Sequence, residues 1–229
     1  MLLKLTSRFV GNVYVIECVG RVVLGDEVKA LESALAVAER EFTKIVLNLS
    51  EVSRLDSIAM GLLVRYAERL GKQDGGLRLA GPPAFVTNLL NMTKLSSMLP
   101  SYPTEEEAIV SFLKERSGGE ALERRGPRVL MFDESADLCV FVRTVLMAQG
   151  YDVRSTCSFR DAKILLRVDG AEYIVVGPST PRLSSDTVVD SLTALSPKAN
   201  VLRLAADFKI RDAQEATDAL LQMFGGRAS

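Results

Sequence analysis

The sequence predicts an α/β protein made of two domains. Short apolar runs rich in Val, Ile and Leu alternate with longer segments whose apolar residues recur every three or four positions, as in strands followed by helices. Residues 114–127 interrupt this alternation with charged residues, Gly118-Gly119 and Gly126-Pro127, a composition typical of a linker. We therefore expect one domain at residues 1–114, a linker at residues 115–127 and a second domain at residues 128–229.

The first half predicts the element order ββαβαβαβα. Alternating residues on both sides of the turn Gly11-Asn12 indicate a hairpin, and Thr104 with Glu107 fits a capping box before the last helix. We expect strands at residues 3–6, 13–16, 44–49, 77–80 and 101–102. Helices are expected to open at Gly25-Asp26, after Asp56, at Pro82-Pro83 and after Thr104, the last over residues 105–113. This order places strands under helices in an α/β sandwich.

The second half predicts four strand–helix units joined by short connections. We expect strands at residues 128–132, 151–155, 173–176 and 201–205, and helices at residues 138–149, 161–168, 186–195 and 213–224. Such units favour an open, mainly parallel, doubly wound sheet.

The composition excludes several classes of function. The chain has no histidine, so it contains no Ser-His-Asp triad, no histidine-ligated metal and no histidine phosphoryl relay. Its cysteines, Cys18, Cys139 and Cys157, form no CxxC pair and are expected to be small buried hydrophobes. A formal net charge of −1 provides no basic surface for nucleic acid.

The sequence also predicts a cytoplasmic protein that is not an integral membrane protein. Lys4 and Arg8 interrupt the apolar N-terminal residues, and no stretch reaches the length of about 18 apolar residues that a membrane span needs. The phosphate-binding motifs GxxxxGK[ST] and GxGxxG are absent, so no motif supports a nucleotide-dependent enzyme.

Two sets of residues are candidates for chemistry. Asp133 and Glu134 follow a strand at the sheet edge where ligands bind in doubly wound folds, and such a pair can hold Mg²⁺ weakly. The alternative, which capping preferences favour, is that Asp133 or Ser135 caps the next helix. Similarly, Ser57 at the start of a helix either caps that helix or accepts a phosphoryl group, and capping is again favoured.

Residues 45–63 resemble the signature of STAS domains, the fold of anti-sigma factor antagonists. In that family a strand ending in Asp-Leu-Ser leads to Asp-Ser-Ser-Gly or Asp-Ser-Thr-Gly and an apolar helix. The resemblance covers about residues 3–113, including Gly20-Arg21 and residues 102–108. It implies a STAS-type mixed sheet with helices and binding to an anti-sigma factor, which in the family is broken when a kinase-type anti-sigma factor phosphorylates the second hydroxyl residue of the motif.

This sequence departs from the family pattern at the phosphoacceptor. Asp56 and Ser57 match the motif, but Ile58 stands at the acceptor position, Ala59 replaces the Gly, and Asn48 replaces the strand-end Asp. The resemblance therefore implies that the serine phospho-switch is lost at Ile58, while the binding surface made by the loop at residues 50–57 and the exposed face of the helix at residues 58–72 remains.

The expected partner-binding residues are Asp56, Ser57, Ile58, Ala59 and Met60. Two arrangements are open for Ile58 and Met60. Both form an apolar contact patch, or both pack under the neighbouring loop.

The second half is similar to a response-regulator receiver domain. Residues 128–134 resemble its first strand with the acidic pair, and residues 171–176 resemble its third strand. Gly177 stands where the phosphoaccepting Asp is expected, Ala205 stands at the Thr or Ser position, and Lys209 lies near the position of an invariant Lys. With one strand–helix unit missing, the resemblance implies a truncated, flavodoxin-like pseudo-receiver that forms no acyl phosphate.

We therefore expect a non-enzymatic bacterial signalling protein that acts in transcription regulation by binding an anti-sigma factor or a larger signalling complex. No cofactor is expected beyond weak Mg²⁺ at Asp133 and Glu134, where phosphoryl chemistry is the remaining enzymatic alternative. Another alternative is a constitutive scaffold, in which the receiver-like domain forms a homodimer and the STAS domain docks on a membrane transporter or a stressosome-like assembly.

Overall fold

The computed structural model describes residues 2–118, 126–179, 185–208, 210 and 212–225. The chain divides into two compact units, Met1–Glu115 and Arg116–Ser229. Most of the expected linker at residues 115–127 lies outside the described residues. The described helices include none with the length and apolar character that a membrane span requires.

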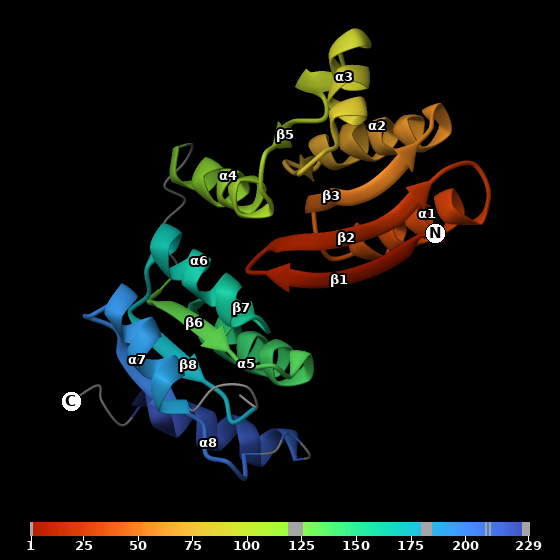
Figure 1. The fold of residues 1–229 in the computed structure, drawn as a ribbon. Coiled ribbons are helices and arrows are strands. Elements are labelled where there is room, and N and C mark those ends of the chain that lie inside the picture. Colours follow the sequence, from red (N-terminus) through yellow and green to blue (C-terminus); the bar gives the residue numbers. More distant parts are fainter. Residues whose placement is uncertain (1, 119–125, 180–184, 209, 211, 226–229) are drawn as a thin grey trace. The chain divides into compact units, whose positions relative to one another are not determined.

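The first unit has the element order that the sequence predicts (Figure 1). Its elements are β1 (Lys4–Val10), β2 (Val13–Val22), α1 (Asp26–Ala38), β3 (Lys44–Leu55), α2 (Ser57–Gly71), β4 (Gly76–Ala80), α3 (Ala84–Met92), the 3₁₀ turn η1 (Leu95–Ser97), β5 (Ser101–Tyr102) and α4 (Glu105–Gly118). The strands are ordered β5-β4-β3-β2-β1, with β1 antiparallel to β2 and the other pairs parallel. The unit is therefore a mixed sheet with helices.

Alternation along β3 determines which helices cover each face of this sheet. Leu47 and its neighbours of the same parity join a buried apolar cluster with Leu35 of α1 and Leu63 of α2. Arg78 of β4 points to the other face, where its guanidinium lies 3.7 Å from the centre of the Phe112 ring of α4. Helices α1 and α2 thus cover one face, and α4 covers the other.

Several elements of this unit are longer than predicted. β1 continues to Val10 and β2 to Val22, past the expected ends at residues 6 and 16. β3 continues past residue 49 to Leu55, because it stays paired with β2 up to the pair Val22 and Leu55, with register shifts on the way. The predicted loop at residues 50–57 is therefore mostly strand. Helix α4 continues past residue 113 to Gly118, because residues 114–117 include the good helix formers Lys, Glu and Arg, so the start of the expected linker is helical.

The second unit also alternates strands with helices (Figure 1). Its elements are β6 (Arg128–Phe132), α5 (Ala136–Ala148), β7 (Asp152–Thr156), α6 (Phe159–Asp169), β8 (Tyr173–Val176), α7 (Ser185–Leu195), β9 (Asn200–Arg203) and α8 (Ala213–Gly225). The strands are parallel and ordered β7-β6-β8-β9. The rings of Tyr151, Tyr173 and Phe224 pack together and hold α8 against the unit.

Candidate functional site

The start of α2 is fixed by the carboxylate of Asp56. Its Oδ1 accepts a hydrogen bond from the backbone N–H of Ala59 at 2.8 Å, so Asp56 is the N-cap of the helix. Its Oδ2 accepts from the backbone N–H of Leu24 at 2.7 Å, which ties the β2–α1 connection to the same point. Burial opposes ionisation of Asp56, but the amides of Ala59, Leu24 and Ile58 together hold its pKa below the ordinary value.

Apolar side chains lie exposed at this junction. Ile58 is 50% exposed and Leu24 is 71% exposed. Asp56 brings them together, because one of its oxygens binds the amide of Leu24 while the other caps the helix that Ile58 begins. We call Leu24, Asp56, Ser57 and Ile58 the α2 N-terminal surface.

The sequence prediction for this surface needs three corrections. Ala59 and Met60 are 0% and 4% exposed and belong to the buried cluster, so their side chains are not on the surface. Ser57 is the first residue of α2 and is exposed, but Asp56 provides the cap that was expected from the Ser57 hydroxyl. Leu24 was missed, since only the tertiary hydrogen bond to Asp56 places it here.

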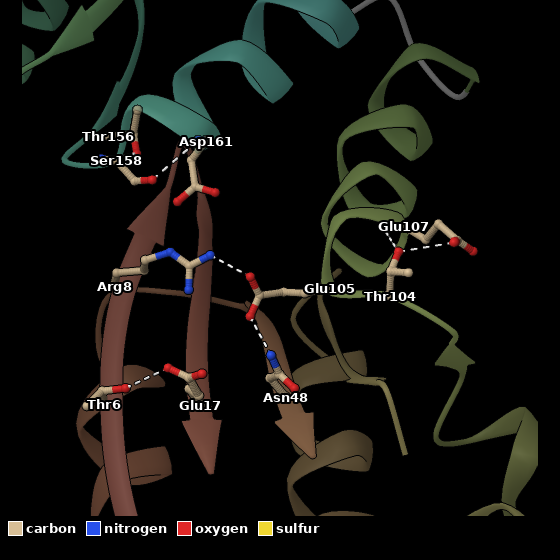
Figure 2. Close-up of polar contacts among 10 residues, drawn as sticks. All are labelled: Thr6, Arg8, Glu17, Asn48, Thr104, Glu105, Glu107, Thr156, Ser158 and Asp161. Carbon is tan, nitrogen blue, oxygen red and sulfur yellow. Dashed lines mark hydrogen bonds and ion pairs between the residues drawn. The ribbon is translucent and has the colours of Figure 1, made fainter. Parts of the chain in front are cut away.

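A second polar cluster joins β1, β3 and α4 (Figure 2). Asn48, which stands where the STAS motif has a strand-end Asp, donates from Nδ2 to Glu105 Oε2 at 2.8 Å. Arg8 pairs with the other oxygen of Glu105 at 2.6 Å, and Asn48 Oδ1 accepts from the amide of Ser50 at 3.0 Å. Asn48 thus binds an acidic side chain that an Asp at this position would repel.

The capping box predicted at the start of α4 is present in its first half (Figure 2). The amide of Glu107 donates to Thr104 Oγ1 at 3.2 Å, and this hydroxyl donates to Glu107 Oε1 at 3.0 Å. The hydrogen bond satisfies one of the free amides at the start of the helix that carries Glu105.

In the second unit, Asp133 is buried and bound by backbone amides. It is 0% exposed, its Oδ1 accepts from Ser135 N–H at 2.7 Å, and its Oδ2 accepts from Ser179 N–H at 2.8 Å. Burial raises its pKa, although both amides act in the opposite direction. Ser135 caps α5 by accepting from Leu138 N–H, as one of the sequence alternatives proposed.

This arrangement does not support the expected Mg²⁺ site at Asp133 and Glu134. Both carboxylate oxygens of Asp133 accept hydrogen bonds from backbone amides, whereas Glu134 is exposed. Within the described parts of the chain, no group of three or more Asp, Glu or Cys side chains is placed to hold a metal ion.

Gly177, the expected phosphoacceptor position, lies directly against Asp133. A Cβ atom built on Gly177 would be 2.1 Å from Asp133 Oδ2 and 2.6 Å from its Cγ. The carboxylate of Asp133 therefore occupies the space that any side chain at residue 177 would need. Ala205 is exposed, and Lys209 lies outside the described residues.

Comparison with known proteins finds similarity in the first unit. Residues 4–108 match the family model of the STAS domain. A Thermotoga maritima protein assigned as an anti-sigma factor antagonist is 31% identical over 68 residues, which are 30% of this chain and 60% of that relative. The chain therefore spans only part of the length of that relative.

Solved structures also align with part of the chain. The Bacillus cell fate determinant SpoIIAA in its phosphorylated form aligns with a TM-score of 0.41 and 22% identity, over 48% of this chain and 99% of that one. An anti-sigma factor antagonist from Mycobacterium paratuberculosis aligns with a TM-score of 0.42 and 27% identity, over 48% of this chain and 92% of that one.

Proposed function

Because residues 4–108 form a STAS domain, we propose that this chain is a non-enzymatic signalling protein that binds a protein partner of the anti-sigma factor class. The observation that carries the proposal is the exposed Ile58 at a helix start that Asp56 joins to the backbone of the exposed Leu24. Single exposed apolar residues are ordinary, but adjacent ones held by a shared carboxylate form a preorganised contact. Binding through this contact therefore loses little conformational entropy.

We propose further that this binding has no serine phospho-switch. Ile58 carries no hydroxyl, and it is the exposed residue at the motif position that the family phosphorylates. Ser57, the neighbouring hydroxyl, stands at the position that the family leaves unmodified. The complex is therefore constitutive and is controlled by the amount of each protein or by the second unit.

For the second unit we propose a pseudo-receiver domain at residues 128–229, joined by a linker at 115–127 to the STAS domain at 1–114. The strand order β7-β6-β8-β9 corresponds to 2-1-3-4, the flavodoxin-like order without its fifth strand. Asp133 fills the space beside Gly177, so no carboxylate at residue 177 is available to accept a phosphoryl group. Such a domain would act in transcription regulation in the bacterial cytoplasm as an adaptor that phosphorylation does not switch.

The experiment is a binding titration with a purified kinase-type anti-sigma factor from the same genome. Ile58→Glu places a charge that must be desolvated in the complex, which costs about 2 kcal/mol or more and weakens binding at least about 30-fold. A helix N-terminus tolerates the negative charge, so the thermal unfolding of the variant stays close to wild type. Unchanged affinity would refute the proposed contact.

Val37→Glu is the matched control. Val37 is 60% exposed on α1, so the same charge is introduced into the same domain away from the α2 N-terminal surface. We expect its affinity to equal that of wild type. An equal loss of affinity in both variants would mean that an added negative charge weakens binding wherever it is placed.

The scaffold alternative has one observation in its favour. Val140 and Met147 of α5 are 53% and 51% exposed and are seven residues apart, so they share one helical face. Self-association through this face would give the homodimer that a scaffold on a transporter or stressosome-like assembly requires. Light scattering of the wild type and of Val140→Glu distinguishes the two: a dimer that the substitution dissociates favours the scaffold.

A further inference from the structure

Cys139 and Cys157 approach each other in the second unit although 17 residues, 140–156, separate them. Cys139 lies in the first half of α5, and Cys157 directly follows β7. The Sγ atom of Cys139 is 3.5 Å from the carbonyl oxygen of Thr156 and 3.3 Å from that of Asp133. Since the Thr156 carbonyl is bonded to the nitrogen of Cys157, the Cα of Cys157 lies within about 6.5 Å of Cys139 Sγ.

The two thiols also interact with each other and differ in character. Interaction with the side chain of Cys139 lowers the pKa of Cys157, although partial burial acts in the opposite direction. The same interaction, together with burial, raises the pKa of Cys139. Cys157 is half-buried and Cys139 is fully buried, so a small molecule reaches Cys157 first.

The third cysteine lacks these features. Cys18 of β2 is 0% exposed in the core of the first unit, and burial raises its pKa to about 12. It belongs to the other compact unit and serves as an internal reference for an unreactive thiol.

We propose that Cys157 and Cys139 form a redox modification site, in which a hydroperoxide oxidises Cys157 and Cys139 resolves it to a disulfide. The Cys157 thiolate attacks the terminal oxygen of the peroxide, the O–O bond breaks, and the leaving alkoxide or hydroxide takes up a proton. The Cys139 sulfur, after losing its proton, then attacks the sulfenic sulfur of Cys157 and expels hydroxide, which leaves as water. Two thiols lose two electrons and the peroxide gains them.

The position of the pair gives the oxidation a structural consequence. The disulfide would join α5 to the connection that precedes α6, whose N-cap is Ser158. It would also remove the thiol proton that Cys139 directs to the carbonyl of Asp133 or of Thr156. Oxidation thus acts on the α5 and α6 ends beside Asp133, where the pseudo-receiver has no phosphoacceptor.

The test is peptide mapping of the full chain after reduction, desalting and exposure to equimolar hydrogen peroxide. We expect the intact mass to fall by about 2 Da, because two hydrogens leave, and a peptide that joins Cys139 to Cys157. Cys18 should remain free and be alkylated only after denaturation. A wild-type protein with Cys157 no more oxidised than Cys18, or with disulfides only between molecules, would overturn the proposal.

Substitutions distinguish the role of Cys157, which reacts with the peroxide, from that of Cys139, which resolves the sulfenic acid. In Cys139→Ala, Cys157 should stop at sulfenic acid, which dimedone traps with a gain of about 138 Da, whereas Cys157→Ser should show no fast oxidation. Cys18→Ser is the matched control and should form the disulfide as wild type does. Circular dichroism checks that each variant is folded, and the wild-type map remains decisive if a variant is not.

Discussion

Gly177→Ala should strongly destabilise the second unit, because Asp133 leaves no room for a side chain. The added Cβ would meet Asp133 Oδ2 at 2.1 Å, its Cγ at 2.6 Å and its Cβ at 2.7 Å, whereas ordinary contacts begin near 3.4 Å. Asp133 must therefore move by more than an ångström. It then loses the hydrogen bonds of 2.7 and 2.8 Å from Ser135 and Ser179.

The magnitude follows from these two bonds. A hydrogen bond to a charged group contributes about 1.5–3 kcal/mol, so the pair contributes about 3–6 kcal/mol. That is a large part of the roughly 5–15 kcal/mol that stabilises a domain. In urea the transition of the second unit should shift downward by roughly 2 M.

The assay is urea unfolding of the full chain, followed by circular dichroism, with Gly225→Ala as the control. At Gly225, the last residue of α8, an added Cβ meets no described atom within 4 Å, so its effect should stay within about 1 kcal/mol. Asp133→Ala should reduce the cost of Gly177→Ala, since only the 2.7 Å contact then remains. A Gly177→Ala protein as stable as Gly225→Ala would refute this reasoning.

Three further predictions follow from the site geometry. Asp56→Ala should destabilise the first unit by about 1 kcal/mol through loss of its N-cap, with Asp56→Asn costing less. Because the pKa of Asp56 is lowered in the folded state, this stabilisation is present above about pH 4 and is lost as the pH falls through the folded pKa. Urea unfolding at pH 7 and at pH 3 measures the difference. Asn48→Asp should lower the stability of the first unit by roughly 2 kcal/mol, because the new carboxylate would face that of Glu105, with Arg8 offsetting part of the repulsion. Asn48→Ala should lower the stability less in the same unfolding assay. Beryllofluoride with Mg²⁺ should leave the NMR amide signals of the second unit unchanged, and a shift that spreads from Asp133 would mean that the unit retains a receiver-like switch.

The sequence predicts the order of elements well because strands and helices here bury apolar residues with different periods. The prediction is wrong or incomplete at residues whose structure depends on contacts with segments distant in the chain. β3 extends to Leu55 because β2 continues beside it, which the local pattern of residues 50–55 does not indicate. The hydrogen bond of Leu24 to Asp56 likewise has no local signal.

The α2 N-terminal surface was predicted only in part. Ile58 and Leu62 are four residues apart and share a helical face, so periodicity predicts the same burial for both. Leu62 is 1% exposed and Ile58 is 50% exposed, a difference that periodicity does not predict. Of the two arrangements left open for Ile58 and Met60, neither holds for both residues, because Ile58 is exposed and Met60 packs inside.

The second unit shows the same limit. The sequence identifies Gly177 as a position without a carboxylate, but only the structure shows that Asp133 fills the space of its missing side chain. Cys139 is a buried small side chain as predicted, whereas its approach to Cys157 depends on the packing of α5 against β7.

The central claim, a constitutive complex through the α2 N-terminal surface, is tested most directly by calorimetric titration of the wild type with a purified kinase-type anti-sigma factor, without and with ATP. After incubation with ATP, the account predicts the same Kd and no gain of the about 80 Da that a phosphoryl group adds. An ATP-dependent loss of affinity accompanied by a phosphopeptide that contains Ser57 would contradict it.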